Sequence, residues 1–178
     1  MVSADASTLC EGWSAHHLAA HLWSLDHAIG AAVLQGAGPL APLGHRWLAA
    51  IVGGHPYHQL VSELAGKQSG FTCMPDDRLT NHRHSLGEWF VHGEDLRRAN
   101  HLPALETPAA VDEQLWLRLR EAARVLLRRE RRSVLLNTPD GRRLHVAGGD
   151  ERIVVTGTPG ELMLWIHGRR KHALVTHG

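Results

Sequence analysis

The first half of the chain repeats its apolar residues at helical spacing. They follow Ser14, a residue type favoured at the N-cap of a helix, and they predict one helix from there to about Gly36. Its apolar stripe consists of Leu18, Leu22, Leu25, Ile29 and Val33. After a loop marked by Pro42, two shorter helices are expected over 47–52 and 56–66, since glycines end both segments.

A longer helix is predicted over 81–99, after a loop at 73–77. Its apolar arc consists of Leu86, Trp89, Phe90 and Leu96. His92 lies at the edge of this arc, and Glu88 and Asp95 lie just beyond it. These three side chains are therefore expected to border a crevice of a helical bundle.

The second half of the chain changes from helical to alternating spacing. Beyond a linker flanked by Pro103 and Pro108, the apolar residues predict a long helix over 109–132. Three strand-like segments separated by turn signals follow, and they predict a small antiparallel meander. The segments are 134–136, 144–146 and 153–155. A last helix, up to Gly168, is expected from Thr158, because an N-cap, a first-turn proline and an acidic residue coincide there.

These elements predict an α+β fold in two parts, a helical bundle over 1–100 and an α+β domain over 101–178. A chain of 178 residues is long enough for one main core and a small appended unit. The formal net charge of +1 gives no field that would attract nucleic acid or a membrane surface. With two cysteines, no signal sequence and no apolar run near the ~20 residues of a membrane span, we expect a cytoplasmic protein.

The 15 histidines are the most unusual part of the composition, because histidine is the commonest metal ligand in proteins. On a helix, the four-residue spacing of Glu88 and His92 places the two side chains on one face. Such a pair is either a solvent-facing ion pair or half of a metal site. His21 borders the apolar stripe of another helix and offers a third ligand, and Asp95 could orient His92. His17 and His84, one turn before His21 and Glu88, are reserve candidates.

The remaining chemical candidates have simpler interpretations. Arg97 and Arg98 end a helix, where cations are favoured, although either could bind a carboxylate. The arginine cluster at 128–132 has the same explanation and lacks the aromatic residues of a nucleic-acid surface. Cys10 is interpreted as a small, partly buried hydrophobic residue.

Two segments together resemble a known family. One is Thr8-Leu9-Cys10-Glu11-Gly12-Trp13 followed by Leu18-Ala19-Ala20-His21-Leu22, and the other is Glu88-Trp89-Phe90-Val91-His92 with Glu94-Asp95-Leu96-Arg97-Arg98. They are similar to the DinB-like proteins related to mycothiol-dependent maleylpyruvate isomerase, in particular to an actinobacterial metal-binding branch. The segment from 155 to 169 is similar to that branch too, so the resemblance covers most of the chain.

The resemblance implies a four-helix bundle whose divalent ion, usually zinc, is held by the residues that match His21, Glu88 and His92. It also implies a low-molecular-weight thiol, mycothiol, as cosubstrate. The expected function is a metal- and thiol-dependent transferase or isomerase acting on a small electrophile. Arg98 or Arg169 is the hypothetical binding partner of an anionic group. Two other classes stay open, a non-catalytic or degenerate metal-binding protein and a metal-dependent hydrolase.

The chain differs from the family pattern in two places. Members usually carry a further helix before the Thr8 segment, whereas only Met1–Ser7 precede it here. The bundle is therefore expected to be short by one helix. Either the start codon is misplaced, or a partner subunit in a homodimer or the helix at 109–132 covers the gap, since an apolar face would otherwise be exposed. The second difference is His17, where an acidic residue is common, and this change is expected to weaken the cap at Ser14.

Overall fold

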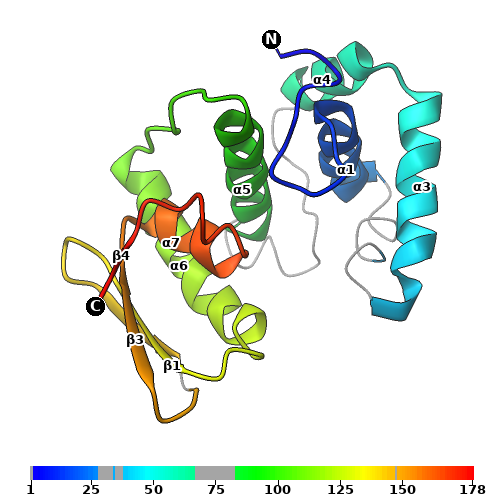
Figure 1. The fold of residues 1–178 in the computed structure, drawn as a ribbon. Helices are drawn as coiled ribbons and strands as arrows, with labels where there is room; N and C mark the ends of the chain where they lie inside the picture. The colour runs from blue at the N-terminus through cyan, green and yellow to red at the C-terminus, as the bar shows by residue number, and fades with distance from the viewer. Residues whose placement is uncertain (1, 28–33, 35–37, 67–82, 147) are drawn as a thin grey trace. The chain divides into compact units, whose positions relative to one another are not determined.

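A computed structural model of the chain describes residues 2–27, 34, 38–66, 83–146 and 148–178 (Figure 1). The chain folds into two compact units, Met1–Ala104 and Leu105–Gly178. We call them unit 1 and unit 2. The fold class is α+β, as predicted, because unit 1 is helical and unit 2 combines helices with a small sheet.

Unit 1 is built around its first helix. That helix, α1 (Ala15–His27), packs against α3 (Ala41–Gly54), α4 (Tyr57–Gly66) and α5 (Arg83–Ala99), and a short 3-10 turn, η1 (Gly38–Leu40), leads into α3 (Figure 1). The central core cluster consists of Ala19, Ala20, Leu48 and Leu60. The small alanines of α1 allow the neighbouring helices to approach closely, which explains why α1 lies at the centre.

The four predicted helices of this half are present, with one boundary wrong. α3 begins at Ala41 instead of near residue 47, because Pro42 lies in its first turn instead of in the preceding loop. Proline is tolerated there, since the first turn has no intrahelical acceptor for its missing N–H. The predicted loop at 73–77 and part of the first predicted helix, 28–33, lie outside the described residues.

An exposed apolar stripe runs along η1 and α3. Leu40, Leu43 and Trp47 are each about half exposed, and their spacing places them on one side of the helix. A homodimer through such a surface stays a prediction. No helix among the described residues is both long and apolar enough to cross a membrane.

Unit 2 packs two helices with a four-stranded sheet. The helices α6 (Ala109–Leu126) and α7 (Pro159–Ile166) contact each other, and α6 also contacts the sheet (Figure 1). The strands are β1 (Ser133–Asn137), β2 (Arg143–Val146), β3 (Arg152–Thr156) and β4 (Thr176–His177). α7 begins as predicted, with the Thr158 side chain accepting a hydrogen bond from Glu161 N. α6 ends at Leu126, earlier than the predicted residue 132.

The prediction of an antiparallel meander is wrong in one pairing. The strand order is β2-β1-β3-β4, and β3 runs parallel to β1 instead of pairing with the free edge of β2. The chain between β2 and β3 passes over the start of β1, where Gly148 and Gly149 lie against the carbonyl oxygens of Arg132 and Arg131. A Cβ atom at either glycine would collide with that backbone, so these two glycines permit the crossing.

Candidate metal centre

Two helices of unit 1 bring together the three side chains predicted as ligands. His21 from α1 and His92 from α5 are buried, and the carboxylate of Glu88 lies between them. Glu88 Oε2 is 3.9 Å from His21 Nε2 and 3.6 Å from His92 Nε2. The three donor atoms therefore converge on one point, with the side chains of α5 one turn apart.

The donor set fits a divalent ion. Ligands bound about 2.0–2.2 Å from a tetrahedral zinc ion lie roughly 3.3–3.6 Å from one another, so small shifts would bring all three atoms to bonding distance. Two imidazoles and one carboxylate are ligands typical of zinc and related ions. Three protein ligands also leave a coordination position open, which is the arrangement of catalytic sites.

Without a bound ion, two of these side chains, Glu88 and His92, form an oppositely charged pair. Burial raises the pKa of Glu88, but the neighbouring imidazoles of His21 and His92 outweigh this effect and hold the pKa well below its ordinary value. Burial likewise lowers the pKa of His92, yet Asp95, Cys10 and Glu88 together hold it well above its ordinary value. A metal ion must displace the His92 proton, so metal binding is expected to weaken as the pH falls.

A buried carboxylate holds His92 from behind. Asp95 is fully buried, and its Oδ2 atom lies 3.0 Å from His92 Nδ1. With Nδ1–H donating to Asp95, the lone pair of Nε2 points toward Glu88 and His21, as a ligand requires. The sequence pattern placed Asp95 just beyond the apolar arc of this helix. In the structure, Asp95 and Glu94 both belong to the buried face of α5. Trp89, which was predicted to lie in the arc, is 41% exposed.

Cys10 and Trp13 are functional neighbours that sequence reasoning missed. The Cys10 thiol donates to Asp95 Oδ2 at 3.2 Å, so it helps to fix the carboxylate that orients His92. The Trp13 ring packs against the rings of His21 and His92, with centroids 5.1 and 6.4 Å away. Both residues lie in the Thr8–Trp13 segment that carries the family resemblance, which is the signal that could have indicated them.

Cys10, His92 and Asp95 form a second group of potential ligands. Asp95 Oδ2 lies 3.2 Å from Cys10 Sγ and 3.0 Å from His92 Nδ1, which are ordinary hydrogen-bond lengths. Ligand atoms around a shared ion repel one another and lie farther apart than this. These contacts are therefore interpreted as hydrogen bonds that hold the His92 side chain in place. His21, Glu88 and His92 therefore stay the candidate ligands, and their role is a prediction.

Replacing Asp95 with asparagine is expected to weaken metal binding by about 10–100-fold, because the partner behind a histidine ligand has effects of that size. Asparagine keeps the shape of the side chain but removes the negative charge that raises the basicity of His92. The measurement is competition with a chelator of known affinity. Glu11→Gln, at an exposed carboxylate of the neighbouring segment, is the matched control. Equal affinities in the two variants would contradict the role of Asp95.

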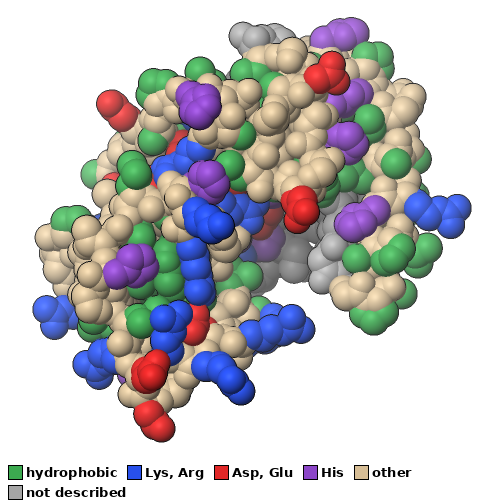
Figure 2. All heavy atoms as spheres, viewed as in Figure 1, with side chains coloured by type: hydrophobic (Ala, Val, Ile, Leu, Met, Phe, Trp, Pro, Cys, Tyr) green, Lys and Arg blue, Asp and Glu red, His purple; other side chains and the backbone are tan. Residues whose placement is uncertain are grey.

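The reserve histidines do not join either donor group among the described residues. His17 Nδ1 instead accepts a hydrogen bond from Ser14 N at 3.4 Å and lies 3.0 Å from Ser14 Oγ. Its imidazole thereby takes the place of the acidic residue in a capping box, so the expected weakening of this cap is offset. Other histidine side chains are spread over the visible face in Figure 2 instead of gathering in one patch.

The two arginines predicted to bind an anionic group both have partners in the structure. Arg98 Nε donates to Glu94 Oε2 at 2.6 Å, and the Glu94 side chain is almost completely buried. Arg169, in unit 2, donates from Nη1 to the carbonyl oxygen of His167 at 2.6 Å. Binding of a ligand by Arg98 or Arg169 stays a prediction.

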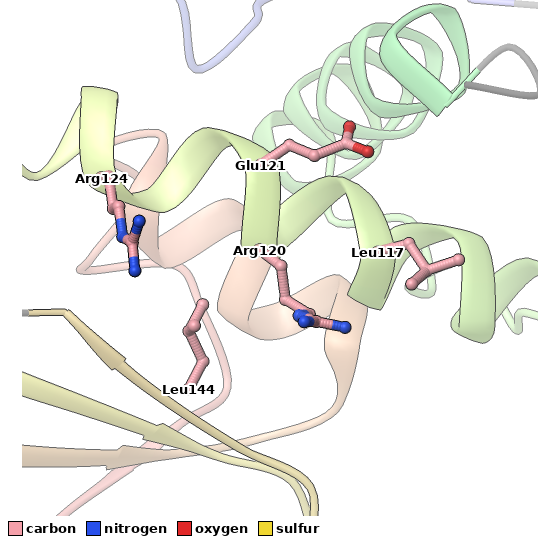
Figure 3. Close-up of a pocket in the computed structure, with 5 residues that line it drawn as sticks. All are labelled: Leu117, Arg120, Glu121, Arg124 and Leu144. Carbon is pink, nitrogen blue, oxygen red and sulfur yellow. The ribbon is translucent and has the colours of Figure 1, made fainter. Parts of the chain in front are cut away.

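Two hollows of different character lie in the two units. In unit 1, a cavity of about 670 Å³ is bounded by α1, α4 and α5 and has His92 in its wall. In unit 2, a hollow of about 350 Å³ lies along α6, where Figure 3 shows Arg120 and Arg124 on the side of the helix toward Leu144. The second hollow is a charged, exposed helix face and contains none of the candidate ligands. The first hollow adjoins the candidate centre, because His92 lines it.

The fold and this donor set define an α+β protein with a candidate metal centre in its helical unit. Two crystal structures of the mycothiol-dependent maleylpyruvate isomerase, one of them of a mutant, are similar to this chain. Their TM-scores are 0.55 and 0.52, at 16% and 18% sequence identity, and each similarity covers 98% of this chain and 82% of the isomerase chain. No protein-family model matches the sequence, and no curated protein matches it either. The similarity therefore establishes the fold, in agreement with the resemblance of the sequence motifs.

Proposed function

We propose that this chain is an enzyme that binds a divalent metal ion, zinc in the first instance, and uses a low-molecular-weight thiol to transfer or isomerise a small electrophile. The observation that carries the proposal is the convergence of His21, Glu88 and His92 beside an apolar cavity. The structural neighbour, a mycothiol-dependent isomerase, supports mycothiol as the thiol. His21, Glu88 and His92 are the proposed ligands.

A bound dication lowers the pKa of a thiol and so supplies a nucleophile at neutral pH. The side chains of this chain provide the setting for that chemistry. Asp95 accepts a hydrogen bond from Nδ1–H of His92 and keeps Nε2 directed at the centre, while the apolar side chains of Leu18 and Leu22 line the adjoining cavity. Arg98 or Arg169 stays the hypothetical partner of an anionic group on the thiol.

The test is conjugation of a thiol with chlorodinitrobenzene, together with cis–trans isomerisation of maleylacetone, an electrophile with a single carboxylate, by the purified full-length protein. We expect turnover of one of these substrates only when both a divalent metal and mycothiol are present. Release of chloride from chlorodinitrobenzene that needs metal but not thiol, with dinitrophenol as the product, would indicate the hydrolase instead. Metal binding without turnover of either substrate would indicate the non-catalytic protein, and both results would contradict the proposal.

A further inference from the structure

The cavity beside His92 has walls that are almost entirely apolar. It is bounded by α1, α4, α5 and Val2, and its volume of about 670 Å³ lies within the usual range for small-molecule sites. Its apolar lining includes Leu18, Leu22, Val61, Leu64, Leu96 and Leu102. A substrate with several charges would lose its hydration there without finding a partner for each charge.

Arg97 is the one arginine among the described residues that line this cavity. Its Nε atom donates to the carbonyl oxygen of Pro103 at 2.6 Å, which fixes the direction of the guanidinium group. The nearest carboxylate contact is long, with Arg97 Nε 4.0 Å from Glu94 Oε1, and Glu94 is bound more closely by Arg98. Arg97 therefore presents positive charge at a largely apolar cavity.

The other polar lining groups, Tyr57 and His92, do not oppose an anion. Burial raises the pKa of Tyr57, so its phenol stays uncharged near neutral pH. Hydrogen bonds to Asp95 and Cys10 engage the Nδ1 side of His92, which leaves the opposite side of the ring for the centre. The charge at the cavity is thus complementary to a single negative group.

We propose that this cavity binds an organic molecule with an apolar body and one anionic group, and that Arg97 binds the anionic group. This inference rests on the proposed function and deepens it. The end of the molecule that reacts would lie beside His92, and the anionic group would lie at Arg97. The inference sets the substrate class apart from dicarboxylates, because Arg97 is the one arginine at the cavity among the described residues and the imidazole of His92 is already paired with Glu88 and Asp95. Arg97, and not the Glu94-bound Arg98, becomes the residue that determines specificity for the anion.

The probes are decanoate, decanol and decanedioate, which share a chain length and differ in charge. Their binding is measured by calorimetry on the full-length protein after treatment with a chelator, because a carboxylate could also bind a metal ion. We expect decanoate to bind more tightly than decanol or decanedioate. Arg97→Gln should weaken decanoate binding by about tenfold, as loss of a charged hydrogen bond does, and leave decanol binding unchanged. Arg97→Lys should restore part of the preference.

Arg46→Gln is the matched control, because Arg46 lies beside Leu43 and Trp47 at a different hollow of unit 1. This variant should bind all three probes like the wild type. The inference is overturned if decanedioate binds as tightly as decanoate, if Arg97→Gln weakens decanol and decanoate equally, or if Arg46→Gln has the same effect as Arg97→Gln. Metal content and thiol-dependent turnover are measured separately, so failure of the proposed function would be seen independently of these results.

Discussion

Purified protein supplied with zinc is expected to hold about one ion per chain, and replacement of His92 by alanine should abolish that binding. His92 supplies one of three proposed ligand atoms and is the one fixed by a buried carboxylate. Its loss leaves a pair of donors from different helices, so we expect affinity to fall by roughly 100-fold or more, beyond the effect of a supporting residue. Elemental analysis after dialysis gives the metal content directly.

His58→Ala is the matched control for this experiment. His58 lies in α4 of the same unit, but it is exposed and outside both donor groups. The control should keep the metal content and the thermal midpoint of the wild type. Wild-type protein that stays free of metal at saturating zinc, or a His92→Ala variant that keeps its ion, would refute the proposed centre.

The sequence could predict that Glu88 and His92 lie on one helix face, but its periodicity could not predict which residue of another helix meets them. Glu88 and His92 are four residues apart in a helix, so their common face follows from helical periodicity alone. Their meeting with His21 depends on how α1 packs against α5, which a single-sequence pattern does not determine. The family resemblance supplied this third residue, and the structure places it 3.9 Å from the Glu88 carboxylate.

Buried polar groups explain what sequence reasoning missed around the site. The pattern of apolar positions placed Asp95 just beyond the apolar arc and made no statement about Glu94, whereas both are fully buried. Their burial depends on partners, His92 and Arg98, that lie one turn away and remove the cost of the isolated charge. Cys10 was missed because its contact with Asp95 spans 85 positions of the sequence.

The sheet shows the same limit at the level of topology. Alternating residues located β1, β2 and β3, but alternation does not specify which edge of a sheet a strand joins. β3 pairs with β1, because Gly148 and Gly149 allow the connection to cross the start of β1. The two-residue strand β4 is too short to have a periodic pattern and was not predicted.

Replacing Arg98 with alanine is expected to lower the free energy of unfolding of unit 1 by about 3–5 kcal/mol, the usual cost of leaving a buried charge without its partner. Glu94 is 1% exposed at its side chain and lies 2.6 Å from Arg98 Nε, so its carboxylate would keep its burial and lose its closest cation. The measurement is urea denaturation followed by helical circular dichroism. Arg46→Ala, at an exposed position of α3, should change stability by less than about 0.5 kcal/mol.

A double variant separates the unpaired charge from loss of packing. Glu94→Leu combined with Arg98→Met removes both charges and keeps apolar volume, so it should be clearly more stable than Arg98→Ala alone. If Arg98→Ala is no less stable than Arg46→Ala, the ion pair contributes nothing to the free energy of unfolding.

The result also bears on the centre, since Glu94 and Arg98 belong to the same helix as Glu88 and His92. If α5 frays without this ion pair, Glu88 and His92 lose the geometry that metal binding needs. The loss of stability in Arg98→Ala should therefore be accompanied by weaker zinc binding, although Arg98 is not itself a metal ligand.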